Sequence, residues 1–205
     1  MTLIQQHDYN KALPKRNTMK HFLLNSESLQ LNVRMKPLNN ICVNLISGKE
    51  LEKEYDPETL PFEFEMLVRK DIDTGEEKAP TLYDFYSNVP IVSTRFLTIF
   101  KNIGVDTVEV FKTQVYWRNQ QRTLHNYHVI NVTEMIDCAV PTEKYNCALA
   151  DIEDGMLTID PSKTNNTPLF RLAKCETHIV VNEVLANAII AEKLSGVILT
   201  PIFQV

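Results

Sequence analysis

Two histidines, His125 and His128, are the side chains whose spacing first suggests chemistry, because imidazole is a common metal ligand. Zinc sites need three or four protein ligands, so a pair of histidines must at least face the same ion. The residues around His128 alternate as in a strand, where side chains three residues apart point to opposite faces. The two imidazoles could not then clamp one ion, and we expect no metal and no other cofactor.

Acidic residues over 151–154 resemble the start of a calcium-binding loop. Such a loop needs glycine at its sixth position and glutamate at its twelfth. Counted from Asp151, these positions hold Met156 and Ser162. The pattern fails, and the segment is typical of a solvated turn.

Nucleophilic catalysis would need a serine or cysteine beside a positioned base, and Cys175 has His178 three residues away. Nothing else nearby marks this pair as activated, and no serine stands in a G-x-S-x-G turn. We therefore predict no catalytic residue and no enzyme activity. The cysteines are widely spaced and are expected to be reduced thiols in small apolar spaces. They are Cys42, Cys138, Cys147 and Cys175.

The net charge of −5 is spread unevenly along the chain. Residues 50–78 hold eleven acids and four bases, a net −7. An acidic surface repels nucleic acid and attracts a basic partner. The one run of bases, over residues 11–20, lacks the interleaved aromatic residues of a nucleic-acid binder. We expect no nucleic-acid partner.

The hydrophobic pattern predicts the elements that would position these side chains. Ser93 and Asn182 can cap helices over 93–103 and 182–194, whose apolar residues recur with helical spacing. Residues 1–28 are interpreted as an irregular lead-in, and Trp117–Asn126 as a hairpin loop. Strands are expected at Leu29–Met35, Ile41–Ile46, Phe62–Arg69, Thr107–Val115, Tyr127–Thr133 and Val197–Phe203.

Strands without regular alternation with helices predict an α+β fold with a mainly antiparallel sheet and two or more packed helices. We expect residues 1–83 to form a strand-rich part with the acidic segment, and residues 84–205 the core, in one compact unit. No apolar run approaches the length of about 18 residues that a membrane helix needs. The start of the chain shows no secretory signal, so we expect a cytoplasmic protein without a membrane partner.

Two surfaces are candidates for binding a protein partner. The first is the acidic segment, which would speed association with a basic protein. Its candidate contacts are Glu50, Glu52, Glu54, Asp56 and Glu58, continued by Glu63 and Glu65. The second combines aromatic and arginine side chains, which dominate binding hot spots. Its residues are Tyr116, Trp117, Arg118 and Arg122. A solvated acidic loop and a tryptophan packed at a sheet edge are the structural alternatives.

Eight short blocks follow one another in a fixed order between residues 84 and 203. They are Pro90–Ser93, Gly104–Asp106, Tyr127–Val132, Ile136–Cys138, Leu157–Asp160, Leu169–Leu172, Val180–Glu183 and Leu194–Val197. Their order and spacing resemble immunity family eleven of the bacterial polymorphic-toxin systems. Asn131, Asp137 and Arg171 match the family pattern, and we expect them to have structural roles, such as bonding the backbone at strand ends.

The resemblance implies a cytoplasmic immunity protein, encoded beside a toxin that is delivered by contact-dependent or type VI secretion. Protection would come from binding that toxin. The resemblance supplies no catalytic residues and does not identify the toxin or the oligomeric state. The alternative is an enzyme of another type, such as a hydrolase that reverses the damage done by the toxin. A pocket with converging titratable side chains would favour the enzyme, and a flat acidic or aromatic surface would favour the binder.

Overall fold

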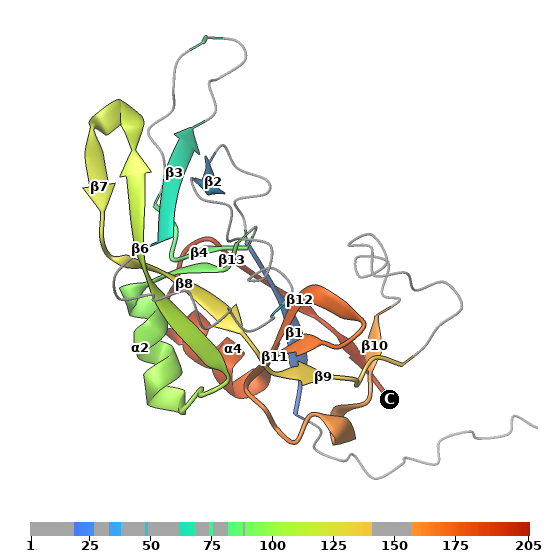
Figure 1. Ribbon diagram of the computed structural model, residues 1–205. Coiled ribbons are helices and arrows are strands. Elements are labelled where there is room, and N and C mark those ends of the chain that lie inside the picture. The colour runs from blue at the N-terminus through green and yellow to red at the C-terminus, as the bar shows by residue number, and fades with distance from the viewer. Residues whose placement is uncertain are drawn as a thin grey trace, which may run out of the picture.

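The structure of the chain, a computed structural model, describes residues 19–26, 33–37, 48, 62–68, 74–75, 82–87, 89–140 and 157–205. Within these ranges, strands form two large sheets and one small sheet, and two α-helices pack beside them (Figure 1). Most neighbouring strands are antiparallel. The predicted α+β class is confirmed.

One sheet has five strands in the order β13-β1-β12-β11-β9. They are β1 (His21–Ser26), β9 (Met135–Ile136), β11 (Leu169–Leu172), β12 (Cys175–Asn182) and β13 (Val197–Pro201). β1 pairs antiparallel with both β12 and β13, whereas β9 runs parallel to β11. The prediction of an irregular lead-in is therefore wrong for His21–Ser26, which lie inside this sheet.

The larger sheet has seven strands, six of them in the order β2-β3-β6-β8-β5-β4. They are β2 (Val33–Pro37), β3 (Phe62–Val68), β4 (Phe85–Tyr86), β5 (Ile91–Ser93), β6 (Val108–Trp117), β7 (Arg122–Leu124) and β8 (Tyr127–Val132). β3 runs parallel to β6, and β7 returns antiparallel to β6 after the 3-10 turn η2 (Arg118–Gln120). The predicted loop over 117–126 is corrected, since much of it is strand.

Two further strands, β10 (Thr158–Ile159) and β14 (Phe203–Gln204), form a small parallel sheet. The 3-10 turn η3 (Pro161–Lys163) follows β10. The strand predicted over 41–46 lies outside the described residues.

Both helices carry the caps that the sequence predicts. α2 (Thr94–Ile103) begins after Ser93, whose hydroxyl accepts a hydrogen bond from the Phe96 N–H. It ends at Gly104, which adopts the left-handed conformation (φ 77°) that favours glycine. α4 (Glu183–Ala191) begins after Asn182, whose side chain accepts from the Leu185 N–H at 3.0 Å. It ends three residues earlier than the predicted 182–194.

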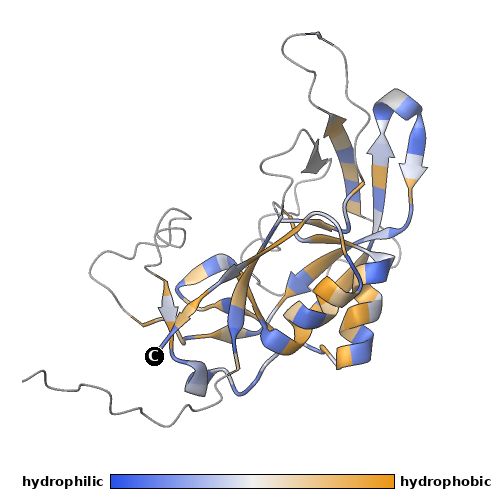
Figure 2. Ribbon diagram, turned by 180° about the vertical axis from the view of Figure 1, so that it is seen from behind, coloured by the Kyte–Doolittle hydropathy of each residue, from blue (hydrophilic) through white to orange (hydrophobic). Residues whose placement is uncertain are grey.

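The helices share one hydrophobic core with both sheets. α2 contributes Phe96 and Phe100, and α4 contributes Leu185 and Ile189. Figure 2 shows the apolar residues that run along the facing sides of the two helices. Residues of both sheets complete this core: Leu24, Leu169, Ile179 and Val181 from the five-stranded sheet, and Phe85, Val92, Ile130 and Val132 from the larger sheet. The two sheets are therefore held together by apolar burial, the main stabilising term in folding.

A polar junction at Asp84 also joins the larger sheet to the turn after α4. Asp84 is 6% exposed, and its Oδ1 accepts a 2.6 Å hydrogen bond from the Ser93 hydroxyl. Its Oδ2 accepts from the backbone N–H and the hydroxyl of Ser195, at 2.9 and 3.0 Å. Next to it, Gly196 (φ 75°) packs so closely on Tyr83 that an added Cβ would lie 2.4 Å from the Tyr83 Cβ. Any side chain at position 196 would push this junction apart.

Arg171 is a second tie between the sheets. It is 1% exposed on β11, and its Nε donates to the Val132 carbonyl at the end of β8, at 3.0 Å. A terminal nitrogen donates to the Glu176 carbonyl at 2.6 Å. Burial lowers the pKa of the guanidinium to about 10, so it stays charged at neutral pH. The expected role in bonding the backbone at a strand end is confirmed for Arg171.

The other two residues of the family pattern each have a side-chain partner. The Asn131 amide donates to the Glu109 carboxylate at 2.9 Å. Asp137 forms a 3.4 Å ion pair with Lys174, in which both side chains are exposed. Exposed ion pairs of this kind contribute little to stability.

Candidate functional site

The β6–β7 hairpin carries the four aromatic and arginine residues that the sequence singled out. Trp117 lies opposite Arg122 in the antiparallel register, and Tyr116 lies opposite Thr123. Figure 1 shows that the hairpin, with β3 beside it, extends past the two helices. The structure therefore brings these residues together at one end of the molecule.

The hairpin divides its candidate residues between two faces. Phe111, Thr113 and Val115 of β6 are buried, and the partly buried Trp117 packs on the same core. Tyr116, 38% exposed, alternates with them and points to the opposite face. Trp117 is packed, as the structural alternative proposed, but it ends the interior strand β6 and pairs with Arg122 of β7, so it does not lie on an edge strand. Tyr116 and Trp117 cannot both face one flat partner surface.

Arg118 forms an ion pair with a buried carboxylate of the neighbouring strand β3. Its Nε lies 2.7 Å from an oxygen of Glu65, which is 5% exposed on β3. The Arg118 side chain itself is 71% exposed, so the pair is half desolvated. Burying a carboxylate costs free energy unless a partner compensates, and Arg118 supplies that compensation.

Replacing Arg118 by alanine should lower the free energy of unfolding by about 1–2 kcal/mol, because Glu65 would stay buried and lose its partner. Urea denaturation measures this loss. The double variant R118A/E65Q should recover part of it, since a neutral amide costs less to bury. A single R118A variant as stable as the wild type would show that the pair is only a surface contact.

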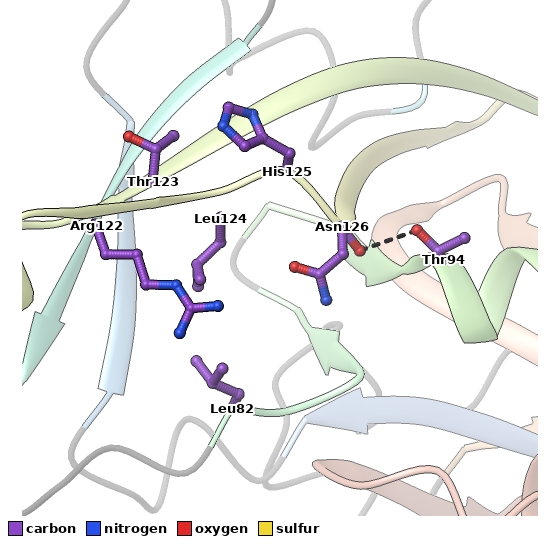
Figure 3. A pocket seen from close by; sticks show the side chains of 7 residues that line it. All are labelled: Leu82, Thr94, Arg122, Thr123, Leu124, His125 and Asn126. Carbon is purple, nitrogen blue, oxygen red and sulfur yellow. Dashed lines mark hydrogen bonds between the residues drawn. The ribbon is translucent and has the colours of Figure 1, made fainter.

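A hollow of about 590 Å³ opens beside the hairpin, near the N-terminal end of α2. Figure 3 shows the side chains of Arg122, Leu124, Leu82 and Asn126 around this space, while those of Thr123 and His125 point away from it. The lining consists of Leu82, Thr94, Arg122, Thr123, Leu124, His125 and Asn126.

Hydrogen bonds fix the walls of this hollow. The Asn126 carbonyl accepts from the Thr94 N–H at 2.9 Å and from the Thr94 hydroxyl at 3.2 Å. On the other wall, the Tyr127 hydroxyl donates to the Tyr83 carbonyl at 2.9 Å, and the Tyr83 N–H donates to the Tyr86 hydroxyl at 3.1 Å. Burial raises the pKa of Tyr127, and that of Tyr86 to about 12, so both phenols stay neutral. The wall that carries Leu82 is thus preformed.

The structure describes only two of the acidic residues that the sequence proposed as partner contacts. Glu50, Glu52, Glu54, Asp56 and Glu58 lie outside the described residues. Of the two acids that continue the segment, Glu63 is exposed on β3 and Glu65 is taken by Arg118.

The residues considered for catalysis have separate surroundings. His125 is exposed, whereas His128 is half-buried on β8 with its Nε2 3.3 Å from the Thr94 hydroxyl. Burial and then Lys101 lower the pKa of His128. The acidic stretch 151–154 lies outside the described ranges. Among the residues that the structure describes, no three His, Cys, Asp or Glu side chains are grouped to hold a metal ion.

The cysteine prediction is confirmed in one case and wrong in another. Cys138 is a buried free thiol whose pKa burial raises to about 11. Cys175 is disulfide-bonded, and its partner lies outside the described residues. A sulfur in a disulfide is not a thiolate nucleophile, so Cys175 and His178 do not form an activated pair in this state.

Comparison with known sequences extends the resemblance towards the N-terminus. No curated protein matches the chain. No helix in the described part of the chain has the length and apolar composition to span a bilayer. The sequence pattern of an immunity protein family, Imm11, matches residues 44–203, so that the match begins well before residue 84 and takes in β3 and the acidic segment. The chain belongs to the Imm11 immunity protein family.

Proposed function

We propose that this protein neutralises one cognate toxin in the cytoplasm of the producing cell by binding it, without turnover of a substrate. Family membership supports the role of immunity protein. The observation that carries the binding mode is the preformed surface at the base of the β6–β7 hairpin, where Arg122 stands beside a hollow lined by polar side chains and two leucines. Arginine is one of the residue types that most often form the centre of a protein interface.

Neutralisation would follow from occlusion of the toxin. A stable interface of standard size covers about 800 Å² on each partner, more than the hollow alone provides. The hairpin face that carries Trp117 and Arg122 would supply the centre, with Leu82 and Leu124 as apolar contacts. The acidic segment 50–58 would supply a charged rim that attracts a basic toxin.

The experiment is co-expression with the toxin encoded beside this gene. The protein should restore growth, and the pair should co-purify and elute together in size-exclusion chromatography. Rescue of growth without any complex would contradict binding. It would favour an enzyme that reverses the toxin's damage, such as a hydrolase.

Reversing three charges of the acidic segment, in the variant E52K/E54K/D56K, should slow association about tenfold and reduce its dependence on salt, because rim charges act mainly on the association rate. Stopped-flow or surface-based kinetics at two salt concentrations measure the change. A matched control, D106K/E134K/E192K, makes the same charge change at three exposed acids elsewhere on the protein. If both variants slow association equally, the acidic segment acts only through the net charge of the protein and not as a specific contact. An unchanged rate in the first would place the interface elsewhere.

A further inference from the structure

The guanidinium of Arg122 lines the hollow beside the hairpin. Among the lining residues that the structure describes, there is no aspartate and no glutamate. Within the described part of the chain, the Arg122 side chain has no ion pair or hydrogen bond, although it points into the hollow (Figure 3). Arg118, four residues earlier, is by contrast paired with Glu65. Of the two arginines on the hairpin, Arg118 pairs with Glu65, whereas Arg122 has no such partner among the described residues and lies beside the hollow.

The end of α2 adds to the positive potential of this place. Thr94 lines the hollow and is the first residue of the helix, and the first turn carries no acid. The N-terminal end of a helix has a partial positive charge and favours an anion. Asp84, whose carboxylate bonds the cap residue Ser93, is itself paired with Arg95 at 3.3 Å. Its charge is therefore largely compensated.

Two leucines line the hollow next to this charge. Leu82, which is 38% exposed, offers hydrocarbon to an incoming group, and the buried Leu124 lies beside the same space. The Asn126 side chain stands beside them and can donate a hydrogen bond to an oxygen. Arginine binds a carboxylate in a two-pronged arrangement that needs both a charge and a planar acceptor.

We propose that the hollow receives an acidic side chain of the toxin, an aspartate or glutamate with an apolar neighbour, whose carboxylate pairs with Arg122 while the neighbour packs on Leu82 and Leu124. This contact rests on the proposed function and gives it a specific chemistry. The toxin would then meet the hairpin with a local acidic group, even where its overall charge is basic. One interface would use charges of both signs, which fixes the register of the two partners.

The first test measures binding of the adjacent toxin to variants of Arg122. R122Q should weaken the complex about 30-fold and R122E at least 100-fold, mainly through faster dissociation, because a desolvated partner carboxylate would lose its counter-charge. K112E is the matched control: it makes the same charge reversal at an exposed residue on the other face of β6. Circular dichroism shows whether each variant is folded, and R122Q keeps the test valid where R122E does not fold.

The outcome separates the two proposals. Tight wild-type binding that R122Q and R122E leave unchanged would overturn the acidic contact and keep the immunity function. Absence of a wild-type complex would overturn the proposed function itself. Restored binding between R122E and a toxin variant with one surface acid changed to lysine would identify the carboxylate.

A second test uses a defined probe with the purified full chain. The probe is an acetylated and amidated peptide, Gly-Leu-Glu-Leu-Gly, compared with its glutamine and lysine counterparts. Addition of the glutamate peptide should shift the nuclear magnetic resonance signals of Arg122, Leu124 and Asn126. These shifts should be at least tenfold smaller with the glutamine peptide. They should be absent when the R122Q variant replaces the wild-type protein. Equal shifts with all three peptides, or shifts confined to other residues, would overturn the proposal.

Discussion

Replacing Asp84 by alanine should lower the free energy of unfolding by about 4 kcal/mol, because several buried or partly buried donors would lose their acceptor. The alanine would remove the acceptor for the Ser93 hydroxyl and for the backbone N–H and hydroxyl of Ser195. Arg95 would lose its ion pair while keeping its 2.9 Å bond to the Glu192 carbonyl. Buried donors without acceptors carry their full desolvation cost. Urea denaturation, monitored by fluorescence of Trp117, measures the change.

Two milder variants separate the parts of this effect. D84N keeps the shape and part of the hydrogen bonding but removes the charge, so it should cost about 2 kcal/mol. S195A removes only the hydroxyl donor and should cost about 1 kcal/mol. A D84A variant within 1 kcal/mol of the wild type would show that the junction is dispensable and that the shared apolar core and Arg171 suffice to hold the sheets together.

The helices were predictable because their signals are local. Ser93 and Asn182 each accept a hydrogen bond from the backbone N–H three residues on, which sequence spacing alone suggests. Gly104 ends α2 for a local reason, its left-handed conformation. α4 ends before the predicted residue 194. Gly196 does not end this helix and instead makes a tertiary contact, the close approach to Tyr83.

β1 could not be found by the same reasoning. Its Leu23 and Leu24 are both buried, the first in the core that includes Phe170 and the second in the core shared with the helices. A strand that is covered on both faces loses the alternation of apolar and polar residues that marks a half-buried strand. The polar His21 and Ser26 at its ends bond Gln204 and Ser87, more than 60 residues away in sequence. Only tertiary structure reveals these partners.

The candidate site was predicted by residue type but not by geometry. Composition singled out Tyr116, Trp117, Arg118 and Arg122, and the structure places all four on one hairpin. Their separate roles depend on strand register and on β3, which runs parallel to β6 and puts Glu65 within reach of Arg118. Parallel pairing joins segments far apart in the chain, so no local pattern announces it.

Acidification should destabilise the protein through two buried imidazoles of the five-stranded sheet. His21 and His178 are 2% and 6% exposed. The Nε2 of each ring is buried and has no hydrogen-bond partner among the described residues. Burial lowers the pKa of both side chains below the ordinary value of 6.5. Both rings are therefore neutral in the folded protein at neutral pH.

His21 shows why protonation is resisted. The Gln204 amide nitrogen donates to the Met19 carbonyl at 3.0 Å and lies 2.8 Å from the His21 Nδ1. Its second N–H can donate to an unprotonated Nδ1, whereas the Met19 carbonyl favours a protonated ring and offsets part of the effect of burial on the His21 pKa. A second proton on the ring would replace this hydrogen bond by two opposed donors and bury a charge beside Phe170.

The direction of the pH effect follows from these lowered pKa values. Well above pH 6.5 both imidazoles are neutral in the folded and the unfolded chain, so they do not change stability with pH there. Below pH 6.5 the unfolded chain binds protons that the folded protein does not, and stability falls. Each imidazole can contribute a slope of up to about 1.4 kcal/mol per pH unit until the pH reaches its folded pKa.

The double variant H21Q/H178Q should therefore lose less stability than the wild type between pH 6.5 and pH 5, by up to about 3 kcal/mol over this interval. Urea denaturation at pH 7.5, 6.5, 5.8 and 5.0 gives both curves. Carboxylates and the half-buried His128 are common to the two proteins, so the difference isolates the two substituted rings. H125Q, at an exposed histidine, should leave the wild-type slope unchanged. Parallel curves for the wild type and the double variant would show that both rings take up their protons in the folded state, which the unpartnered Nε2 atoms and the Gln204 contact argue against.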